Sequence, residues 1–415
     1  MAIRAARRKV TSNRPPFLRW WFRNNGLVLC GALVAYAVTT GSALYAGKLL
    51  RPPPSLSRQA AVVAVPEKLK DVRRRYIELS AAVEAKPDDP ALLLQLAGTQ
   101  RDMGTIRQAM NSYRKVLALQ PRSREALFGL GRLAAATGEV NLATAKADEL
   151  ASFWPARPES SLLKAQIAFL AKNQDQARNH WHAALKLDPA NREARYMLVT
   201  SYLDQRNYAE AARLAEIGMK ATPEEFELRL LLAKSLSGMG RVAEALTLLQ
   251  SAPAKDRNSP ELLMMLADLL IRRGEYVPAI TCYEELLHRF PDHAVALNNL
   301  AMLHADHGYD LERAASLAST LYTKFPRDAA VCDTMGWVLF KQGKLEQALA
   351  LLSKGAEGMP NNPAHRYHYG AALLKAGETA AGRKEVATAL KLSKEFDGAD
   401  QAQSLLGNAP RQSVA

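Results

Sequence analysis

Small or short side chains recur along most of this chain at a fixed interval of 34 residues. The first series, which shifts by one residue before its last two members, comprises Ala97, Gly131, Ala165, Val199, Ala233, Ala267, Ala301, Gly336 and Gly370. A second series lies twelve residues after the first and includes Ala109, Ala143, Ala177, Ala211, Ala245, Ala279 and Ala348. Prolines follow after twelve more residues, at Pro121, Pro155, Pro189, Pro223, Pro291, Pro326 and Pro360. A repeat of this length with three fixed internal positions predicts an all-α solenoid of helix–turn–helix units.

The small residues are needed where the two helices of one repeat, A and B, approach each other. A large side chain there would overpack the seam, at a cost of about 1–3 kcal/mol. The proline ends helix B because it lacks an amide donor and clashes with the preceding turn. Helix A is expected to end at a glycine in seven repeats, at Gly104, Gly138, Gly240, Gly274, Gly308, Gly343 and Gly377.

This pattern resembles that of tetratricopeptide repeat (TPR) proteins, and it covers residues 90–396 as nine repeats. The repeats begin at residues 90, 124, 158, 192, 226, 260, 294, 329 and 363. The resemblance implies a right-handed α-solenoid that binds other molecules. The sequence departs from the pattern in three places. Helix B of the fifth repeat should end early because Arg257 replaces its proline. Gly382 replaces the alanine of the last repeat, and the seventh repeat has an extra residue around Tyr309 and Asp310. Residues 397–415 are predicted to form a capping helix and tail, since a solenoid end must be shielded from solvent.

The positive charge of the chain is concentrated at its N-terminus. The formal net charge is +14, and the first 65 residues contain ten Lys or Arg and no Asp or Glu. The remaining residues carry 45 basic against 41 acidic side chains. The repeats are therefore almost neutral, and their charge does not predict a nucleic-acid partner.

Residues 26–47 contain no charged side chain. As a helix of roughly 33 Å, this segment would cross a hydrocarbon core of about 30 Å. Seven basic residues precede it and three follow closely, which predicts a cytoplasmic basic tail at residues 1–25 and repeats on the periplasmic side. The sequence thus predicts a single-pass protein of the bacterial inner membrane. A Pro-rich spacer (48–66) and a leading amphipathic helix (67–89) then connect the anchor to the repeats.

Residues 26–47 allow three other interpretations. A cleaved signal peptide would use the weak small-residue site at Gly41, Ser42 and Ala43, but its apolar region is usually shorter. Lipoprotein processing at Cys30 is disfavoured because Leu29, which precedes it, is not small. A buried core helix lacks a neighbouring domain to cover it. The single-pass anchor is the interpretation that we carry forward.

The sequence offers no residues for an enzymatic function. It contains no glycine-rich phosphate loop, no HExxH helix and no nucleophile elbow. The cysteines form no CxxC pair and are interpreted as small core residues. Two histidine pairs, His304 with His307 and His365 with His368, lie three residues apart near Asp306, Cys332 and Asp333, but packing or surface roles are favoured over a zinc site. We therefore predict a non-enzymatic chain without metal or cofactor.

The A helices of TPR solenoids line the concave face, where ligands bind. The second, fifth, ninth and twelfth places of each repeat are predicted to face this groove. Large side chains at such places mark a binding surface, unless they merely pack against adjacent A helices. The candidate groove residues are Phe128, Arg132, Leu162, Phe169, Tyr196, Trp337, Phe340 and Tyr367.

The last repeats carry a more specific resemblance. Residues 297–303, 333–339 and 367–370 resemble C-terminal repeats of bacterial envelope TPR proteins that accompany exopolysaccharide export and exosortase (PEP-CTERM) sorting systems. The resemblance implies a scaffold that binds protein partners of an export or surface-assembly machine. A second hypothesis is a periplasmic scaffold that holds polysaccharide-synthesis enzymes together or touches the nascent polymer. A third, which needs the opposite orientation, is a cytoplasm-facing membrane receptor that recognises targeting segments or partner proteins.

Overall fold

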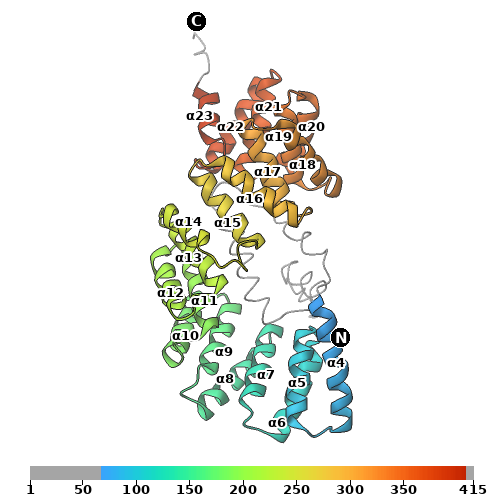
Figure 1. The fold of residues 1–415 in the computed structure, drawn as a ribbon, viewed down its shortest axis with the longest axis vertical. Coiled ribbons are helices and arrows are strands. Elements are labelled where there is room, and N and C mark those ends of the chain that lie inside the picture. The colour runs from blue at the N-terminus through green and yellow to red at the C-terminus, as the bar shows by residue number, and fades with distance from the viewer. Residues whose placement is uncertain (1–66, 408–415) are drawn as a thin grey trace, which may run out of the picture. The chain divides into compact units, whose positions relative to one another are not determined.

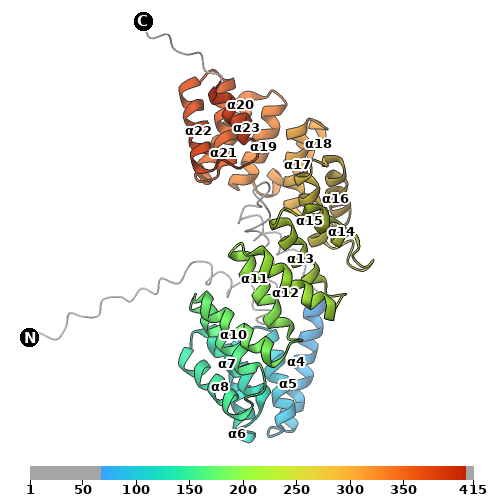
Figure 2. The same cartoon turned by 90° about the vertical axis from the view of Figure 1, so that its left-hand side faces the viewer.

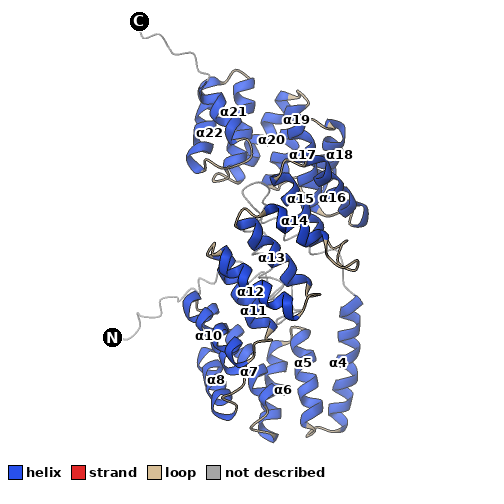
Figure 3. Cartoon of the chain, turned by 60° about the vertical axis from the view of Figure 1, so that its left-hand side comes forward, coloured by secondary structure: helices blue, strands red, loops and turns tan. Residues whose placement is uncertain are grey.

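The computed structural model describes residues 67–407, and every regular element in this range is a helix (Figures 1 and 3). The predicted tail (1–25), membrane segment (26–47) and spacer (48–66) lie outside the described residues. None of the helices between 67 and 407 combines the length and apolarity that crossing a membrane requires. The all-helical prediction is therefore confirmed for the described residues, whereas the anchor stays a prediction.

The described chain forms two compact units, which we call unit 1 (residues 67–201) and unit 2 (residues 202–407). Unit 1 comprises α4 (Glu67–Ala85), α5 (Pro90–Asp102), α6 (Ile106–Leu119), α7 (Arg124–Thr137), α8 (Val140–Phe153), α9 (Glu159–Leu170), α10 (Gln174–Leu187) and most of α11 (Arg192–Asp204). After the end of α11, unit 2 comprises α12 (Tyr208–Ala221), α13 (Phe226–Gly238), α14 (Val242–Gln250), α15 (Pro260–Arg272), α16 (Tyr276–Arg289), α17 (Ala294–His307), α18 (Leu311–Lys324), α19 (Ala329–Lys341), α20 (Leu345–Gly358), α21 (Pro363–Lys375), α22 (Thr379–Leu392) and α23 (Ala399–Gly407). From α5 to α22, an A helix alternates with a B helix along the chain.

The small residues of the two series lie where helices A and B meet. A Cβ atom on Gly336 of α19 would come 2.8 Å from Leu352 Cγ of α20, so this seam has no room for a larger residue. In the last repeat, a Cβ on Gly382 would lie 2.8 Å from the carbonyl oxygen of Gly370. The glycine that departs from the alanine series therefore lets α21 and α22 approach backbone to backbone.

The turns between helices A and B all use a left-handed residue at the fifteenth place of the repeat. Glycine occupies this place in seven repeats, with φ between 65° and 87°. Lys172 and Arg206 occupy it in the third and fourth repeats, with φ of 62° and 59°. A side chain with a Cβ is disfavoured in this conformation, so the turn is imposed by the helix pair and not by its own sequence.

The carbonyl of the proline between repeats has a recurring hydrogen-bond partner that the sequence did not reveal. Arg229 Nη2 donates to the Pro223 oxygen at 3.0 Å, and Arg366 Nε donates to the Pro360 oxygen at 3.0 Å. Arg195 makes the same contact with Pro189. These arginines occupy the fourth place of their repeats and tie the start of an A helix to the preceding turn.

The departures from the repeat pattern appear where the sequence places them. Helix α14 ends at Gln250 after nine residues, and Arg257 Nε donates to the Ala252 oxygen at 2.9 Å. Asp310 caps α18 by accepting from the Arg313 amide at 2.8 Å. Helix α23 packs against α21 and α22 near the C-terminal end of the described chain (Figure 2).

Candidate functional site

The eight predicted groove residues differ in exposure. Leu162, Tyr196, Trp337 and Tyr367 are only 6%, 3%, 3% and 7% exposed. Phe128, Arg132, Phe169 and Phe340 are half-buried. The first four are therefore buried, and a role in binding stays a prediction for all eight.

In unit 1, the A helices are joined by polar side chains on one face. Arg132 Nη1 of α7 lies 2.9 Å from Glu193 Oε2 of α11, two repeats further on. The Arg132 guanidinium carbon lies 5.4 Å from the centre of the Phe128 ring. Gln166 of α9 donates to the Arg132 carbonyl oxygen at 3.2 Å. Phe128 and Arg132 thus form one half-buried, amphipathic surface.

Phe169 does not join that surface. Its ring centre lies 5.9 Å from that of Trp181 on α10, the B helix of the same repeat. Trp181 is only 2% exposed. Phe169 therefore covers a core tryptophan, a role that its place in the repeat did not reveal.

In unit 2, Trp337 of α19 is the centre of an aromatic stack. Its ring lies nearly parallel to those of Phe340, at 5.0 Å, and His368, at 4.1 Å. Its Nε1 donates to Asp306 Oδ1 of α17 at 2.6 Å. Lys341 Nζ lies 4.8 Å from the ring centre and 3.9 Å from Asp306 Oδ1. The stack buries Trp337 and leaves Phe340, Lys341 and Asp306 nearer the surface.

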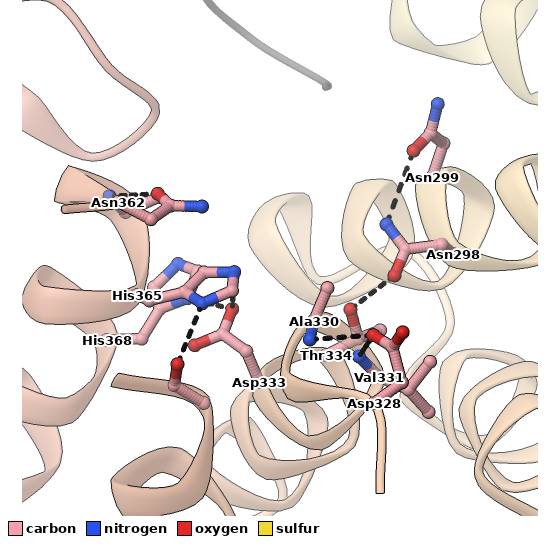
Figure 4. Close-up of polar contacts among 12 residues, drawn as sticks. Asn298, Asn299, Asp328, Ala330, Val331, Asp333, Thr334, Asn362, His365 and His368 are labelled. Carbon is pink, nitrogen blue, oxygen red and sulfur yellow. Dashed lines mark hydrogen bonds and ion pairs between the residues drawn. The ribbon is translucent and has the colours of Figure 1, made fainter. Parts of the chain in front are cut away.

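Next to the stack, Asp333 of α19 contacts two histidines of α21 (Figure 4). Asp333 Oδ2 lies 2.8 Å from His368 Nδ1 and 3.6 Å from His365 Nε2. His365 Nδ1 lies 3.2 Å from the Gly355 oxygen. All three side chains are buried, so this cluster connects α19, α20 and α21 through polar contacts.

The electrostatics of this cluster favour a charged pair. Burial opposes the charge of His368, but the neighbouring Asp333 carboxylate outweighs it and raises the pKa of His368 above its usual value. Burial alone would raise the pKa of Asp333, but the two neighbouring histidines lower it below its usual range. A buried pair of this kind specifies a packing arrangement more than it adds stability.

The His, Cys and Asp side chains that the sequence suggests as possible metal ligands do not gather at one point within residues 67–407. Neither ring nitrogen of His304 has a hydrogen-bond partner, and Cys332 Sγ lies 3.5 Å from the Pro326 oxygen. Within residues 67–407, no three His, Cys, Asp or Glu side chains are arranged to hold a metal ion. His307 instead stacks on the Tyr276 ring, with the ring centres 3.7 Å apart.

Sequence reasoning missed the carboxyl groups that gather near the stack. Burial, followed by repulsion from Asp306, raises the pKa of Asp397 to about 7. Burial raises the pKa of Asp268 to about 6, although Arg272 and Lys234 oppose the shift. Asp268 and Lys234 occupy the ninth place of their repeats, which is predicted to face the groove. Arg272 and Asp306 occupy the thirteenth place, which is not, and Asp397 lies beyond the repeats.

Comparison with known proteins agrees with this architecture. Two family models, both described as tetratricopeptide repeat, match this chain. One matches residues 94–161 and 162–225. The other matches residues 202–269, 236–305 and 339–409. A TPR repeat-containing protein of Pseudomonas aeruginosa is 34% identical over 77 residues, or 19% of this chain and 13% of that protein. Cellulose synthase operon protein C of Pseudomonas fluorescens is 28% identical over 146 residues, or 33% of this chain and 11% of that protein.

The chain therefore spans only a small part of these two curated relatives. Among solved structures, a tetratricopeptide repeat protein from Parabacteroides merdae aligns with a TM-score of 0.51 at 17% identity, covering 60% of this chain and 99% of that one. This likeness concerns the fold alone. Together the two family models cover more than half of the sequence. The chain belongs to the tetratricopeptide repeat proteins.

Proposed function

We propose that this chain is a non-enzymatic, membrane-anchored scaffold that brings together protein partners of a bacterial envelope assembly or export system. The observation that carries the proposal is a nearly neutral TPR array that follows a 22-residue uncharged segment with a basic N-terminal flank. An array of this kind supplies A-helix surfaces for binding. The anchor would hold them beside the membrane.

Polysaccharide production is the envelope process that the comparisons favour. The match to cellulose synthase operon protein C links a third of this chain to a protein whose name refers to a polysaccharide synthase. The resemblance of residues 294–405 to exopolysaccharide-associated TPR proteins supports the same assignment. The partners would be proteins of that machinery, held by the half-buried surface of unit 1 and the stack of unit 2.

Orientation is the first element to test. A reporter active only in the periplasm, fused after Ala415 in the full chain, should be active. A well-expressed fusion without activity would contradict the periplasmic scaffold and favour the cytoplasm-facing receptor. A cytoplasmic reporter at the same site provides the reciprocal measurement.

Partner binding is tested by photocrosslinking in cells. Photoreactive residues at Phe128 and Phe340, which are half-buried, should capture specific proteins of the export machinery. The same residue at Tyr283, which is 1% exposed, is the matched negative control. Equal capture at all three positions, or none above background, would contradict binding through the A helices.

A further inference from the structure

The B helices of unit 1 share a feature that its fold does not require. Helices α6, α8 and α10 end on Leu119, Phe153 and Leu187. These side chains are 43%, 37% and 41% exposed. They lie 34 residues apart, so they occupy the same place in three successive repeats and line one edge of the unit. We call this surface, together with Arg122 and Trp154, the unit 1 edge.

Five B helices of unit 2 end at the corresponding place, on Ala221, Arg289, Lys324, Gly358 and Leu392, whereas α14 ends before it. Only the last of these five residues is large and apolar, so the repeat also accepts small and charged residues at this place. Three large apolar residues in succession on unit 1 form an exposed patch, in contrast to the single exposed apolar residues that any soluble surface carries.

Two depressions in the surface lie along the same edge. One, of about 460 Å³, is lined by Gln120, Pro121, Arg122 and Ser123. The other, of about 370 Å³, is lined by Arg122, Ser152, Phe153 and Trp154. Arg122 lines both depressions. The edge thus offers two open hollows, one of which is lined in part by the exposed Phe153 ring.

Two positively charged side chains lie at or next to this edge: Arg122, which is part of it, and Arg157, whose backbone amide donates to the Trp154 oxygen at 3.1 Å. The Arg122 guanidinium carbon lies 5.0 Å from the centre of the Phe153 ring, which itself makes an edge-to-face contact with Trp154 at 5.6 Å. Arg122 and the exposed Arg157 form no ion pair with any residue between 67 and 407. A cation that is placed over an aromatic ring and lacks a counter-ion is suited to a carboxylate ligand.

We infer that the unit 1 edge is a second docking surface, which binds an acidic, apolar segment of a partner protein. Apolar side chains of the segment enter the two depressions and contact Leu119, Phe153 and Leu187. A carboxylate of the segment pairs with Arg122, which lies between the depressions. The positive charge of Arg122 and Arg157 makes an acidic partner complementary, and the hollows suit side chains better than the flat surface of a bilayer.

The test uses the full chain in a mild non-ionic detergent and two fluorescent helical peptides of equal length. Both peptides carry leucines on one face; the flanking positions are Glu in one and Lys in the other. The edge should bind the Glu peptide about tenfold more tightly than the Lys peptide, and added salt should reduce the difference. Equal affinities would overturn the inference.

Variants then localise the binding. Phe153→Ser and Arg122→Glu should each weaken binding of the Glu peptide about tenfold. Leu392→Ser is the matched control, because Leu392 ends a B helix of unit 2 and is 41% exposed. An equal loss with Leu392→Ser would overturn the assignment to unit 1. Unchanged circular dichroism and melting temperature would show that the exposed positions leave the fold intact.

Two other occupants are decided by the same variants. The full chain could bind vesicles of anionic phospholipid but not the peptides. If Phe153→Ser and Arg122→Glu abolish that vesicle binding, the edge is assigned to a membrane surface. Concentration-dependent dimerisation that both variants abolish would assign it to a second copy of the chain. Either result would overturn the inference. Crosslinking at Phe128 and Phe340 should be unaffected by the edge variants, so the two surfaces can fail independently.

Discussion

Unit 1 and unit 2 are built from the same repeat but use their A helices differently. In unit 1, Arg132 of α7 and Glu193 of α11 bridge the face through a half-exposed ion pair beside Phe128. In unit 2, the corresponding face is closed by Trp337, which is 3% exposed and stacks on His368. The repeat therefore determines which side chains lie on the face, whereas their identity determines whether the face stays a surface or becomes core.

The largest difference is expected for the removal of an aromatic side chain. Trp337→Ala should lower the free energy of unfolding of the last repeats by about 3–5 kcal/mol, because it leaves a cavity between α19 and α21. Phe128→Ala, at a half-buried place, should cost about 1 kcal/mol, since less apolar area is lost. Hydrogen exchange of the α19–α22 amides measures the local effect. Similar losses in the two variants would show that the two faces are equally exposed in solution.

The second effect tests how the stack is closed at the C-terminal end. Gly398 has a φ of 88°, and a Cβ on it would lie 2.3 Å from the Tyr367 ring. Gly398→Ala should therefore cost about 3 kcal/mol, from the backbone conformation and overpacking together. Gly377 has a φ of 87° but no atom within 4 Å of its added Cβ. Gly377→Ala should cost only about 1 kcal/mol.

Thermal denaturation of both glycine variants, with hydrogen exchange of α23, separates the two contributions. If Gly377→Ala proves as costly as Gly398→Ala, then contact between the Gly398 backbone and Tyr367 does not hold α23 in place. In that case, the cap of unit 2 would rest on the contact of Phe396 with Tyr367, whose ring centres are 6.0 Å apart.

The repeat pattern predicted the helices and most turns but not the closing of unit 2. Periodicity places Trp337 and Phe128 on A-helix faces alike, yet it does not report how closely the next A helix approaches. The left-handed turns at Lys172 and Arg206 were not predicted, because a lysine or an arginine gives no local turn signal. The pKa of Asp397 depends on Asp306, which lies 91 residues earlier in the chain. Interactions between repeats are therefore the part that a single sequence does not reveal.

The third effect is a pH dependence that arises mainly in unit 2. The pKa of Asp397 is raised from 3.8 to about 7, so the folded state binds this proton more tightly than the unfolded state does. The free energy of unfolding should fall by about 2 kcal/mol between pH 4 and pH 7, once partial exposure of the carboxyl is considered. The raised pKa of His368 acts in the same direction, because its contribution is complete below pH 6.5 and is lost as the pH rises through the folded-state value.

Hydrogen exchange or melting measured from pH 4 to pH 9 gives the sign directly. The α19–α23 region should lose stability over this range, with the amides of α7–α9 as the internal reference. Asp397→Asn, which mimics the protonated carboxyl, should reduce the slope below pH 7 and leave most of the His368 contribution, which comes from Asp333, in place. A stability that rises with pH in unit 2 would contradict the raised pKa values of both groups.

The smallest effect is expected at the partly exposed ion pair of Arg132 and Glu193 in unit 1. Glu193→Gln removes the negative charge opposite Arg132 but retains an oxygen that can accept its hydrogen bond. The side chains of Arg132 and Glu193 are 13% and 32% exposed, so the loss should be about 0.5–1 kcal/mol and should shrink at high salt. Thermal denaturation at 50 and 500 mM salt provides the measurement, with Glu125→Gln as a more exposed control on the same face. A salt-insensitive loss above about 2 kcal/mol would mean that the pair is desolvated like Asp333 and His368. The A-helix faces of the two units would then be equally closed, and the binding surface proposed around Phe128 and Arg132 would lose its basis.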